Sequence, residues 1–492
     1  MKTPLLSRTL SWRGLVILLL ILGGVLRLID LNDPPLDFHA SRQLRNFLVA
    51  RDIYYRLSPD ADSRTRDLAA SFARSVGRYE PPVMESVVAL TYRLTGGENY
   101  AIPRIWQTIF WLLAGIALFD LARRAISPWA GLTALAYYLV LPFGVQASRS
   151  FQPDPLMTSA FIVGMYFLYR WSEEQIWKWA VLAGVFLGFA TLVKIVIAFF
   201  AGAIALTMVL FTLRRDFWKS RQVWVMALLM ALPALVYYVL LNPGRSSEYF
   251  FSWSVALVKL ITSTDFYSKW LAFLGSLFGL TVLFASLAGT LIAPPRLRWL
   301  LVGAWIGYLA YGLTLPFQMY THSYYHIQLV PIVALGLAAA VDPIYRTVST
   351  QGVAGRAAFV GLVIAVVGYH SWVARSVLVA EDFRHEPAVW VKIGDAIPEG
   401  ANVIALTQDY GYRLMFFAWR KTSLWPLNTD LAEIRNDDRD TAGRFDEITA
   451  GDDYFLVTAF SQLDKQPELK KILDGFPIAA RGDGFVLYEL RR

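Results

Sequence analysis

Long apolar runs fill residues 14–377, and they constrain the fold of this chain more than any other feature. The chain is 56% hydrophobic, whereas soluble domains are about 45–50% apolar. Because a membrane-spanning helix needs about 20 mostly apolar residues, the pattern predicts an all-α polytopic membrane domain. Eleven spans are expected, at residues 12–30, 102–122, 128–147, 154–171, 177–193, 195–213, 222–242, 269–292, 298–316, 325–342 and 356–378.

The first apolar run, Trp12–Ile29, follows the basic residues Lys2 and Arg8. A secretory signal peptide also places an apolar run after basic residues, but that run is shorter and ends at a small-x-small cleavage site. No such site stands out after Ile29, so the sequence predicts a retained first span.

Lysine and arginine residues are distributed unevenly between the short loops. With a cytoplasmic N-terminus, the basic residues of one side are Lys2, Arg8, Arg13, Arg123, Arg124, Arg170, Lys178, Arg214, Arg215, Lys219, Arg221, Arg296, Arg298, Arg346 and Arg356. This is the positive-inside pattern of a multi-pass plasma (inner) membrane protein. It accounts for the net charge of +8 without invoking nucleic acid. An odd number of spans then puts the C-terminal residues outside the cytoplasm.

Residues 31–101 and 379–492 are too long to be simple connectors. The first is assigned to the predicted membrane domain, and the second is predicted to be a domain of its own. Residues 1–378 form the membrane domain, which includes the long first outer loop 31–101. Amphipathic helices are predicted in that loop at 39–57 and 64–77. In the first of these helices, an apolar set is expected to lie along the membrane surface: Leu44, Phe47, Leu48, Ile53 and Tyr54. A basic set is expected to point away from that surface: Arg42, Arg45 and Arg51.

Residues 379–492 read as a small, water-soluble, extracytoplasmic α/β domain. Short apolar and amphipathic patterns predict helices at 388–397, 410–419 and 467–473, and strands at 402–406, 454–458 and 484–490. The domain contains neither a Walker loop nor a dinucleotide fingerprint. The chain also contains no cysteine, which excludes disulfides and thiolate chemistry.

Three carboxylates fall on the predicted outer face. Asp37 follows Pro-Pro after the first span, Glu80 precedes another Pro-Pro, and Asp154 lies in SRSFQPDP. A carboxylate at such a position can accept a proton from an incoming hydroxyl as a general base. Helix capping is the alternative for Asp37 (or Ser41) and for Asp154, and a solvated loop carboxylate is the alternative for Glu80.

Cations and aromatic residues accompany these carboxylates on the same predicted face. Lys194 interrupts an apolar stretch, and an ionisable residue at membrane depth is a functional candidate unless it snorkels to the interface. The other candidates that follow from position are Arg42, Arg149, His39 and, in the loop QMYTHSYYH, Tyr320, His322, Tyr325 and His326. An aromatic belt is the alternative for the tyrosines, and His-x-x-x-His alone is a weak metal signal.

Ordered motifs over residues 12–345 resemble the GT-C superfamily of membrane glycosyltransferases, in its bacterial protein-mannosyltransferase-like (family 39-like) and aminoarabinose-transferase-like branch. The motifs are GGVLRLIDL with DFHASRQ, then EPPVMESVVALTYRLTGGENYAIPRIWQTIFW, SRSFQPDPLMTSAF, GVFLGFATLVK and HSYYHIQLVPIVAL. The chain departs from many relatives in having Phe-His after Asp37 and in having Glu80 before Pro-Pro. These departures bear on the donor and on any metal requirement.

The resemblance implies transfer of a sugar from a polyprenyl-phosphate donor to a glycan, lipid or protein acceptor on the extracytoplasmic face. Asp37 would be the general base, with Asp154 and Glu80 as further catalytic carboxylates. By the same resemblance, Lys194, Arg149, Arg42 and His322 would bind the donor phosphate, and His39, Tyr320, Tyr325 and His326 the substrate. No metal or cofactor is predicted, although a divalent metal remains compatible with the residues. An inactive scaffold subunit of a membrane complex and a lipid-linked-sugar transporter are the alternative functions.

Overall fold

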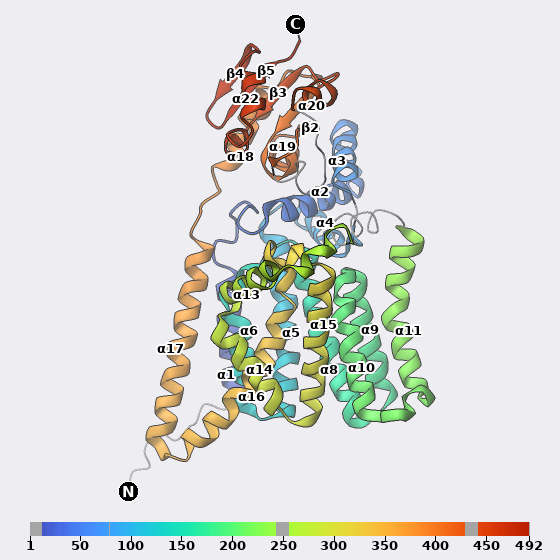
Figure 1. Ribbon diagram of the computed structural model, residues 1–492, viewed down its shortest axis with the longest axis vertical. Coiled ribbons are helices and arrows are strands. Elements are labelled where there is room, and N and C mark those ends of the chain that lie inside the picture. Colours follow the sequence, from blue (N-terminus) through green and yellow to red (C-terminus); the bar gives the residue numbers. More distant parts are fainter. Residues whose placement is uncertain (1–11, 78, 243–254, 429–440, 492) are drawn as a thin grey trace. The chain divides into compact units, whose positions relative to one another are not determined.

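The computed structural model describes residues 12–77, 79–242, 255–428 and 441–491 (Figure 1). The chain folds into two compact units. We call residues 1–31, 78–84 and 101–380 the membrane unit, and residues 32–77, 85–100 and 381–492 the mixed unit. The predicted basic residues Lys2 and Arg8, and residues 243–254 between the predicted spans 222–242 and 269–292, lie outside the described residues.

Most α-helices of the membrane unit run roughly along one direction (Figure 1). Its first half consists of α1 (Trp12–Arg27), α5 (Ala101–Ala125), α6 (Pro128–Val140), α7 (Pro142–Arg149), α8 (Pro153–Glu174), α9 (Trp177–Val193), α10 (Ala198–Leu213) and α11 (Arg221–Leu235). Its second half consists of α13 (Thr264–Phe278), α14 (Leu280–Ile292), α15 (Pro295–Thr314), α16 (Leu329–Ser349) and α17 (Gly352–Leu378). Every predicted span therefore overlaps at least one helix.

When membrane spans are counted by helix length and composition, the described residues contain fewer than the predicted eleven. Five described helical segments are long and apolar enough to cross a membrane: Ala101–Ala125, Ile195–Lys219, Arg221–Leu241, Leu329–Ser349 and Gly352–Leu378. Two bent pairs, α6 with α7 and α13 with α14, raise the number to seven if each pair is one span. The protein is thus a multi-pass membrane protein, and the count of eleven stays a prediction.

The predicted straight span at 269–292 is broken. α13 and α14 meet at Gly279 with a bend of 94°, and Gly279 has φ +79°. Because only glycine adopts this conformation without a steric penalty, the apolar run changes direction there. The hydropathy pattern extends across the break because it records polarity and not direction.

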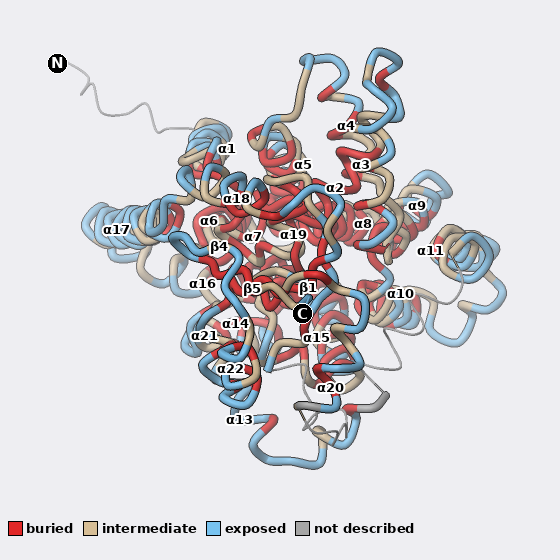
Figure 2. The backbone as a smooth tube through the Cα atoms, turned by 90° about the horizontal axis from the view of Figure 1, so that it is seen from above, coloured by how far each residue is buried: buried red, intermediate tan, exposed pale blue. Residues whose placement is uncertain are grey.

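Glycines allow several membrane helices to approach closely. A Cβ atom on Gly289 of α14 would lie 1.9 Å from the carbonyl oxygen of Gly336 in α16, and one on Gly188 of α9 would lie 2.1 Å from that of Leu229 in α11. Small residues serve this purpose in membranes, where van der Waals packing drives helix association. By contrast, α17 is exposed along most of its length (Figure 2), as expected of a helix surrounded by lipid.

The mixed unit begins with helices from the long first loop. α2 (Ala40–Arg56) and α3 (Ser63–Val76) match the two predicted amphipathic helices, and α4 (Val83–Thr95) runs from the membrane unit into this one. The predicted orientation of α2 is wrong in one respect. Arg45 and Arg51 are buried and not directed into water, because Arg45 donates to the carbonyl of Gly77 at 3.1 Å and Arg51 binds Glu98.

A small five-stranded sheet forms the rest of the mixed unit, in the order β2-β1-β3-β5-β4. Its strands are β1 (Val403–Leu406), β2 (Ser423–Leu424), β3 (Tyr454–Val457), β4 (Ile478–Gly482) and β5 (Phe485–Glu489). β1 pairs in parallel with β2 and β3, whereas β5 is antiparallel to β3 and β4.

Short helices accompany the sheet: α18 (Glu386–Asp395), α19 (Tyr412–Phe417), α20 (Thr441–Ile448), α21 (Phe460–Leu463) and α22 (Pro467–Leu473). The six predicted elements of this region are confirmed, while β2, β4, α20 and α21 were not predicted. β2 has only two residues and β4 is mostly exposed, so neither carries the apolar run by which a strand is recognised. α19 packs against α2, which joins the first loop to the C-terminal residues.

Candidate functional site

A buried ion pair joins two helix termini of the membrane unit. Lys194 Nζ lies 2.7 Å from Asp154 Oδ1, and both side chains are at most 5% exposed. Asp154 lies in the first turn of α8, which begins at Pro153. Lys194 follows the last residue of α9 and precedes the 3₁₀ turn Ile195–Ile197. A break in the helix therefore delivers the lysine to the carboxylate, 40 residues away in sequence.

The pair is incompletely satisfied. Asp154 Oδ2 is buried without a hydrogen-bond partner among the described residues, as are the hydroxyl oxygens of Thr158 and Ser159 further along α8. Burying unpaired polar atoms costs roughly 1–3 kcal/mol each, and an ion pair at membrane depth is costly as well. Such a cost is typical of a position that binds a polar group from outside the chain.

Aromatic rings surround the lysine. Its Nζ lies 5.0 Å from the ring centroid of Tyr324 and 4.9 Å from that of Tyr325, within the range of cation–π attraction. His322 packs its ring on both tyrosines, with centroids 5.5 and 6.0 Å away. The structure thus brings together four predicted residues, Asp154, Lys194, Tyr325 and His322.

Arg149 is buried against the segment that follows α1. It is 1% exposed, and its Nη1 donates to the carbonyl oxygens of Arg27 and Ile29 after α1. Arg104 donates in the same way to the carbonyl of Leu31 at 2.8 Å. These carbonyls have no helical partner at a helix C-terminus. The arginines therefore hold the chain where it leaves α1, so for Arg149 the geometry favours a positioning role over a direct phosphate contact.

His326 is also engaged within the protein. Its Nδ1 lies 2.9 Å from the hydroxyl of Tyr308, and its Nε2 lies 3.0 Å from the carbonyl of Met319. Since a carbonyl only accepts, Nε2 carries the proton and Nδ1 accepts from the tyrosine. Tyr320 is half-buried beside α13, with Lys269 Nζ 5.7 Å from its ring centroid. Neither residue makes a described contact with Lys194.

The mixed unit holds the carboxylate that follows the first span. Gln43 Nε2 donates to Asp37 Oδ1 at 3.1 Å and to the carbonyl of Phe38 at 2.9 Å, which fixes the half-buried carboxylate. His39, with φ +49°, occupies the N-cap of α2 and makes no side-chain capping bond. Arg42 lies in the first turn of α2 and is half-buried.

Helix capping accounts for neither aspartate. The N-cap of α2 is His39 and that of α8 is Gln152, whereas Asp37 lies before the helix and Asp154 inside it. Glu80 is half-buried in the turn that precedes α4, in the membrane unit. Across the described ranges, no three His, Asp or Glu side chains converge in an arrangement able to hold a metal ion.

Several residues around these predicted positions were not foreseen. They are Gln43, which orients Asp37; Tyr324, which shares the lysine with Tyr325; and Arg104, which binds the exit of α1. Tyr324 lies in the motif QMYTHSYYH next to the predicted Tyr325, so the sequence contained the information needed to select it. Gln43 and Arg104 also stood in quoted motifs, DFHASRQ and EPPVMESVVALTYRLTGGENYAIPRIWQTIFW, but the motifs did not indicate their partners, which are Asp37 and the carbonyl of Leu31.

Comparison with known proteins supports a family assignment. Residues 79–241, about a third of the chain, match the model of the dolichyl-phosphate-mannose-protein mannosyltransferase family. A crystal structure of ArnT from Cupriavidus metallidurans bound to undecaprenyl phosphate is similar over 98% of both chains, with a TM-score of 0.55 and 15% identity. The chain is therefore similar to the protein-mannosyltransferase family over this part of its sequence, and to ArnT in its fold.

A second GT-C structure is similar as well. The archaeal oligosaccharyltransferase AglB from Archaeoglobus fulgidus, in complex with an inhibitory peptide and a dolichol-phosphate, covers 92% of this chain and 70% of its own, with a TM-score of 0.57 and 11% identity. At such identities the structural likeness concerns the fold alone. No curated protein sequence matched the chain.

Proposed function

We propose that this protein is a GT-C glycosyltransferase that transfers a sugar from a polyprenyl-phosphate donor to an acceptor hydroxyl or amide. The observation that carries the proposal is the buried Asp154–Lys194 pair, in which one carboxylate oxygen lacks a partner among the described residues. The family match and the lipid phosphates bound to ArnT and AglB support the donor class.

The chemistry assigns one role to each charged group. The acceptor oxygen (or nitrogen) attacks the anomeric carbon, the bond from that carbon to the phosphate oxygen breaks, and the phosphate leaves with the bonding electron pair. A phosphate leaving group needs charge stabilisation more than protonation. Lys194, with His322 nearby, supplies positive charge for it, and Arg42 is a further candidate in the mixed unit.

Asp37 is the proposed general base, which takes the proton of the acceptor. A general base must be held in a defined orientation, and the hydrogen bond from Gln43 provides that orientation. Asp154 holds Lys194 in place and offers its second oxygen to a substrate hydroxyl. Glu80 and His39 remain candidates for acceptor binding, and the enzyme needs no metal in this scheme.

The first test removes the base. Asp37→Asn keeps the shape of the side chain and its contact with Gln43, and is expected to lower transfer by about 100- to 10,000-fold. The assay follows consumption of a polyprenyl-phosphate hexose and release of polyprenyl phosphate in native membranes. Asp60→Asn, at an exposed aspartate of the same loop, is the matched control. Turnover of Asp37→Asn near that of the control would contradict the role.

This assay also separates the alternative functions. An inactive scaffold subunit would release no polyprenyl phosphate even with the unaltered chain. A transporter would move the lipid-linked sugar between leaflets of reconstituted vesicles without cleaving it. Release of polyprenyl phosphate that requires Asp37 excludes both.

The proposed topology has a test of its own, because the chain contains no cysteine. Single substitutions Asp483→Cys and Gln351→Cys introduce a thiol at two exposed positions. In sealed right-side-out membrane vesicles, an impermeant maleimide is expected to label the first variant, and to label the second only after permeabilisation. The reverse pattern would show that residues 379–492 face the cytoplasm.

A further inference from the structure

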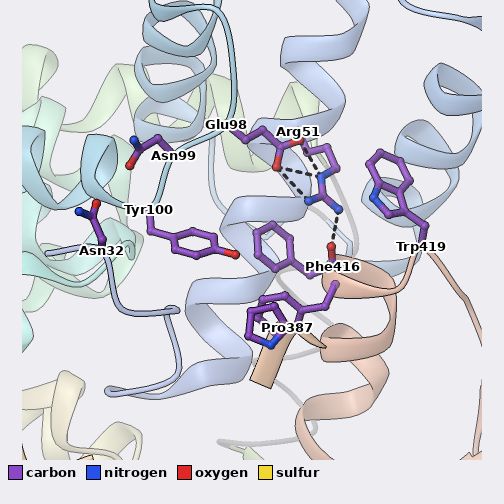
Figure 3. Close-up of a pocket in the computed structure, with 9 residues that line it drawn as sticks. Asn32, Arg51, Glu98, Asn99, Tyr100, Pro387, Phe416 and Trp419 are labelled. Atoms are coloured by element: carbon purple, nitrogen blue, oxygen red, sulfur yellow. Dashed lines mark hydrogen bonds and ion pairs between the residues drawn. The ribbon is translucent and has the colours of Figure 1, made fainter. Parts of the chain in front are cut away.

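The mixed unit contains a pocket that none of the proposed chemistry uses. Its volume is about 510 Å³, within the range of roughly 300–1,000 Å³ that is typical of small-molecule sites. All of its lining residues belong to the mixed unit. Figure 3 shows Asn32 and Asn99 on one side of the Tyr100 ring, and Arg51 and Trp419 on the other.

The charged part of the pocket wall is rigid and neutral. Arg51 binds Glu98 in a bidentate manner, with Nε 2.9 Å from Oε1 and Nη2 2.9 Å from Oε2. Its remaining nitrogen, Nη1, donates to the carbonyl of Phe416 at 2.8 Å. The guanidinium also lies between two rings, with Cζ 4.3 Å from the centroid of Phe416 and 4.4 Å from that of Trp419. All three nitrogens of the guanidinium are therefore engaged within the protein, and Glu98 balances its charge.

This neutrality selects the class of ligand. Arg51 and Glu98 are the charged members of the described pocket lining, and they cancel each other. An anionic ligand would meet a carboxylate that is one-fifth exposed and a cation already paired. A neutral ligand meets no such penalty, and each oxygen of Glu98 keeps lone-pair capacity to accept from a hydroxyl.

The remaining lining offers the two surfaces that a sugar ring needs. Tyr100, Phe417 and Trp419 are partly exposed aromatic residues, and their faces suit the C–H face of a pyranose. Asn32 and Asn99 are exposed amides, each with a carbonyl acceptor and two donors for hydroxyl groups. Burial raises the pKa of Tyr100, so its hydroxyl stays protonated and able to donate at neutral pH.

We propose that this pocket binds a neutral carbohydrate, with Tyr100 as the stacking platform and Asn99 and Glu98 as the hydroxyl-binding groups. The inference does not rest on the transfer reaction, because the pocket requires neither Asp37 nor Lys194. A glycan held there would be recognised by its hydroxyl pattern and not by a phosphate.

The experiment titrates the full-length, detergent-solubilised protein with neutral trisaccharides and follows saturation-transfer-difference NMR. The probes are mannotriose, chitotriose and maltotriose, with inorganic phosphate and a neutral hydrophilic peptide as comparison ligands. We expect at least one trisaccharide to bind saturably. Tyr100→Ala and Asn99→Ala are each expected to weaken that binding about tenfold or more, whereas Asp37→Asn leaves it unchanged.

Tyr410→Ala is the matched control, because Tyr410 is another exposed tyrosine of the mixed unit outside the pocket lining. Should Tyr100→Ala fail to fold, Asn99→Ala, which removes only an exposed amide, decides the matter. The proposal is overturned if no trisaccharide binds saturably, if Tyr410→Ala weakens binding as much as the pocket variants, or if phosphate or the peptide binds more tightly than every sugar. Absence of transfer by the unaltered protein, with saturable trisaccharide binding intact, would count against the proposed reaction alone.

Discussion

Each unit of this protein has an ion pair with little solvent exposure, and the two pairs are built differently. In the membrane unit, Lys194 meets Asp154 through one carboxylate oxygen, and the other oxygen lacks a partner among the described residues. In the mixed unit, Arg51 uses both fork nitrogens on Glu98 and its third nitrogen on a carbonyl, while two rings enclose it.

The two pairs differ in how completely their charged groups are hydrogen-bonded within the protein. A planar arginine in a bidentate, stacked arrangement is well ordered, and here all three of its nitrogens are engaged, so it acts as a support for the pocket around it. A lysine is a compact charge on a flexible stem, and its partner here retains an unsatisfied oxygen. The incomplete pair is therefore the one suited to binding a substrate group, and variants of both pairs can test this distinction.

The largest effect is expected from the incomplete pair. Lys194→Met removes the positive charge proposed to stabilise the leaving phosphate, and should lower transfer by about 100- to 1,000-fold. The measurement is release of polyprenyl phosphate per folded molecule. Lys178→Met, at an exposed lysine in the first turn of α9, the helix that ends just before Lys194, is the control.

A second variant separates charge stabilisation from folding. Lys194→Met leaves Asp154 buried without its cation, which by itself destabilises the protein. The double variant Lys194→Met/Asp154→Asn removes that unpaired charge, so its thermal midpoint should recover while its activity does not. If activity recovered together with stability, the pair would be structural.

The saturated pair should affect stability more than turnover. Arg51→Met leaves Glu98 without its partner and is expected to cost about 3 kcal/mol of unfolding free energy, at the low end for a buried pair because Glu98 is partly exposed. Arg51→Met/Glu98→Gln should recover much of that loss, as measured by thermal unfolding in detergent. A loss of turnover per folded molecule as large as that of Lys194→Met would remove the contrast between the two pairs.

The smallest effect is expected from an exposed pair in the mixed unit. Arg64 Nη2 lies 2.6 Å from Glu399 Oε1, and both side chains are about three-quarters exposed. Surface pairs of this kind contribute little, so Arg64→Ala should leave the thermal midpoint unchanged. A clear decrease in the thermal midpoint would show that solvent exposure does not predict how much an ion pair of this unit contributes to stability.

The same surface pair has a pH signature. The hydrogen bond from Arg64 lowers the pKa of Glu399. Whatever stability the pair contributes is therefore present above the pKa of an unfolded glutamate and is lost as the pH falls through the lowered value in the folded protein. We expect the unaltered protein and Arg64→Ala to show closely similar stability profiles between about pH 3 and pH 7.

The sequence by itself determined the membrane character, the position of nearly every helix and the resemblance to membrane glycosyltransferases. Apolar runs must bury their backbone polar groups in helices when lipid surrounds them, and this requirement is local. Lys194 was recognised for the same reason, since a charge within an apolar run is conspicuous without any structure. The two amphipathic helices of the first loop and six elements of the C-terminal residues also followed from periodicity.

Only the tertiary structure decided which groups meet. Asp154 and Lys194 are 40 residues apart, Arg51 finds Glu98 and the carbonyl of Phe416, 365 residues away, and Arg149 binds carbonyls at the end of α1. Local patterns record polarity and helix period, whereas these partners are selected by packing, by unpaired backbone carbonyls and by the bend at a glycine. The sequence therefore identified the charges, and the fold determined which partners each of them meets.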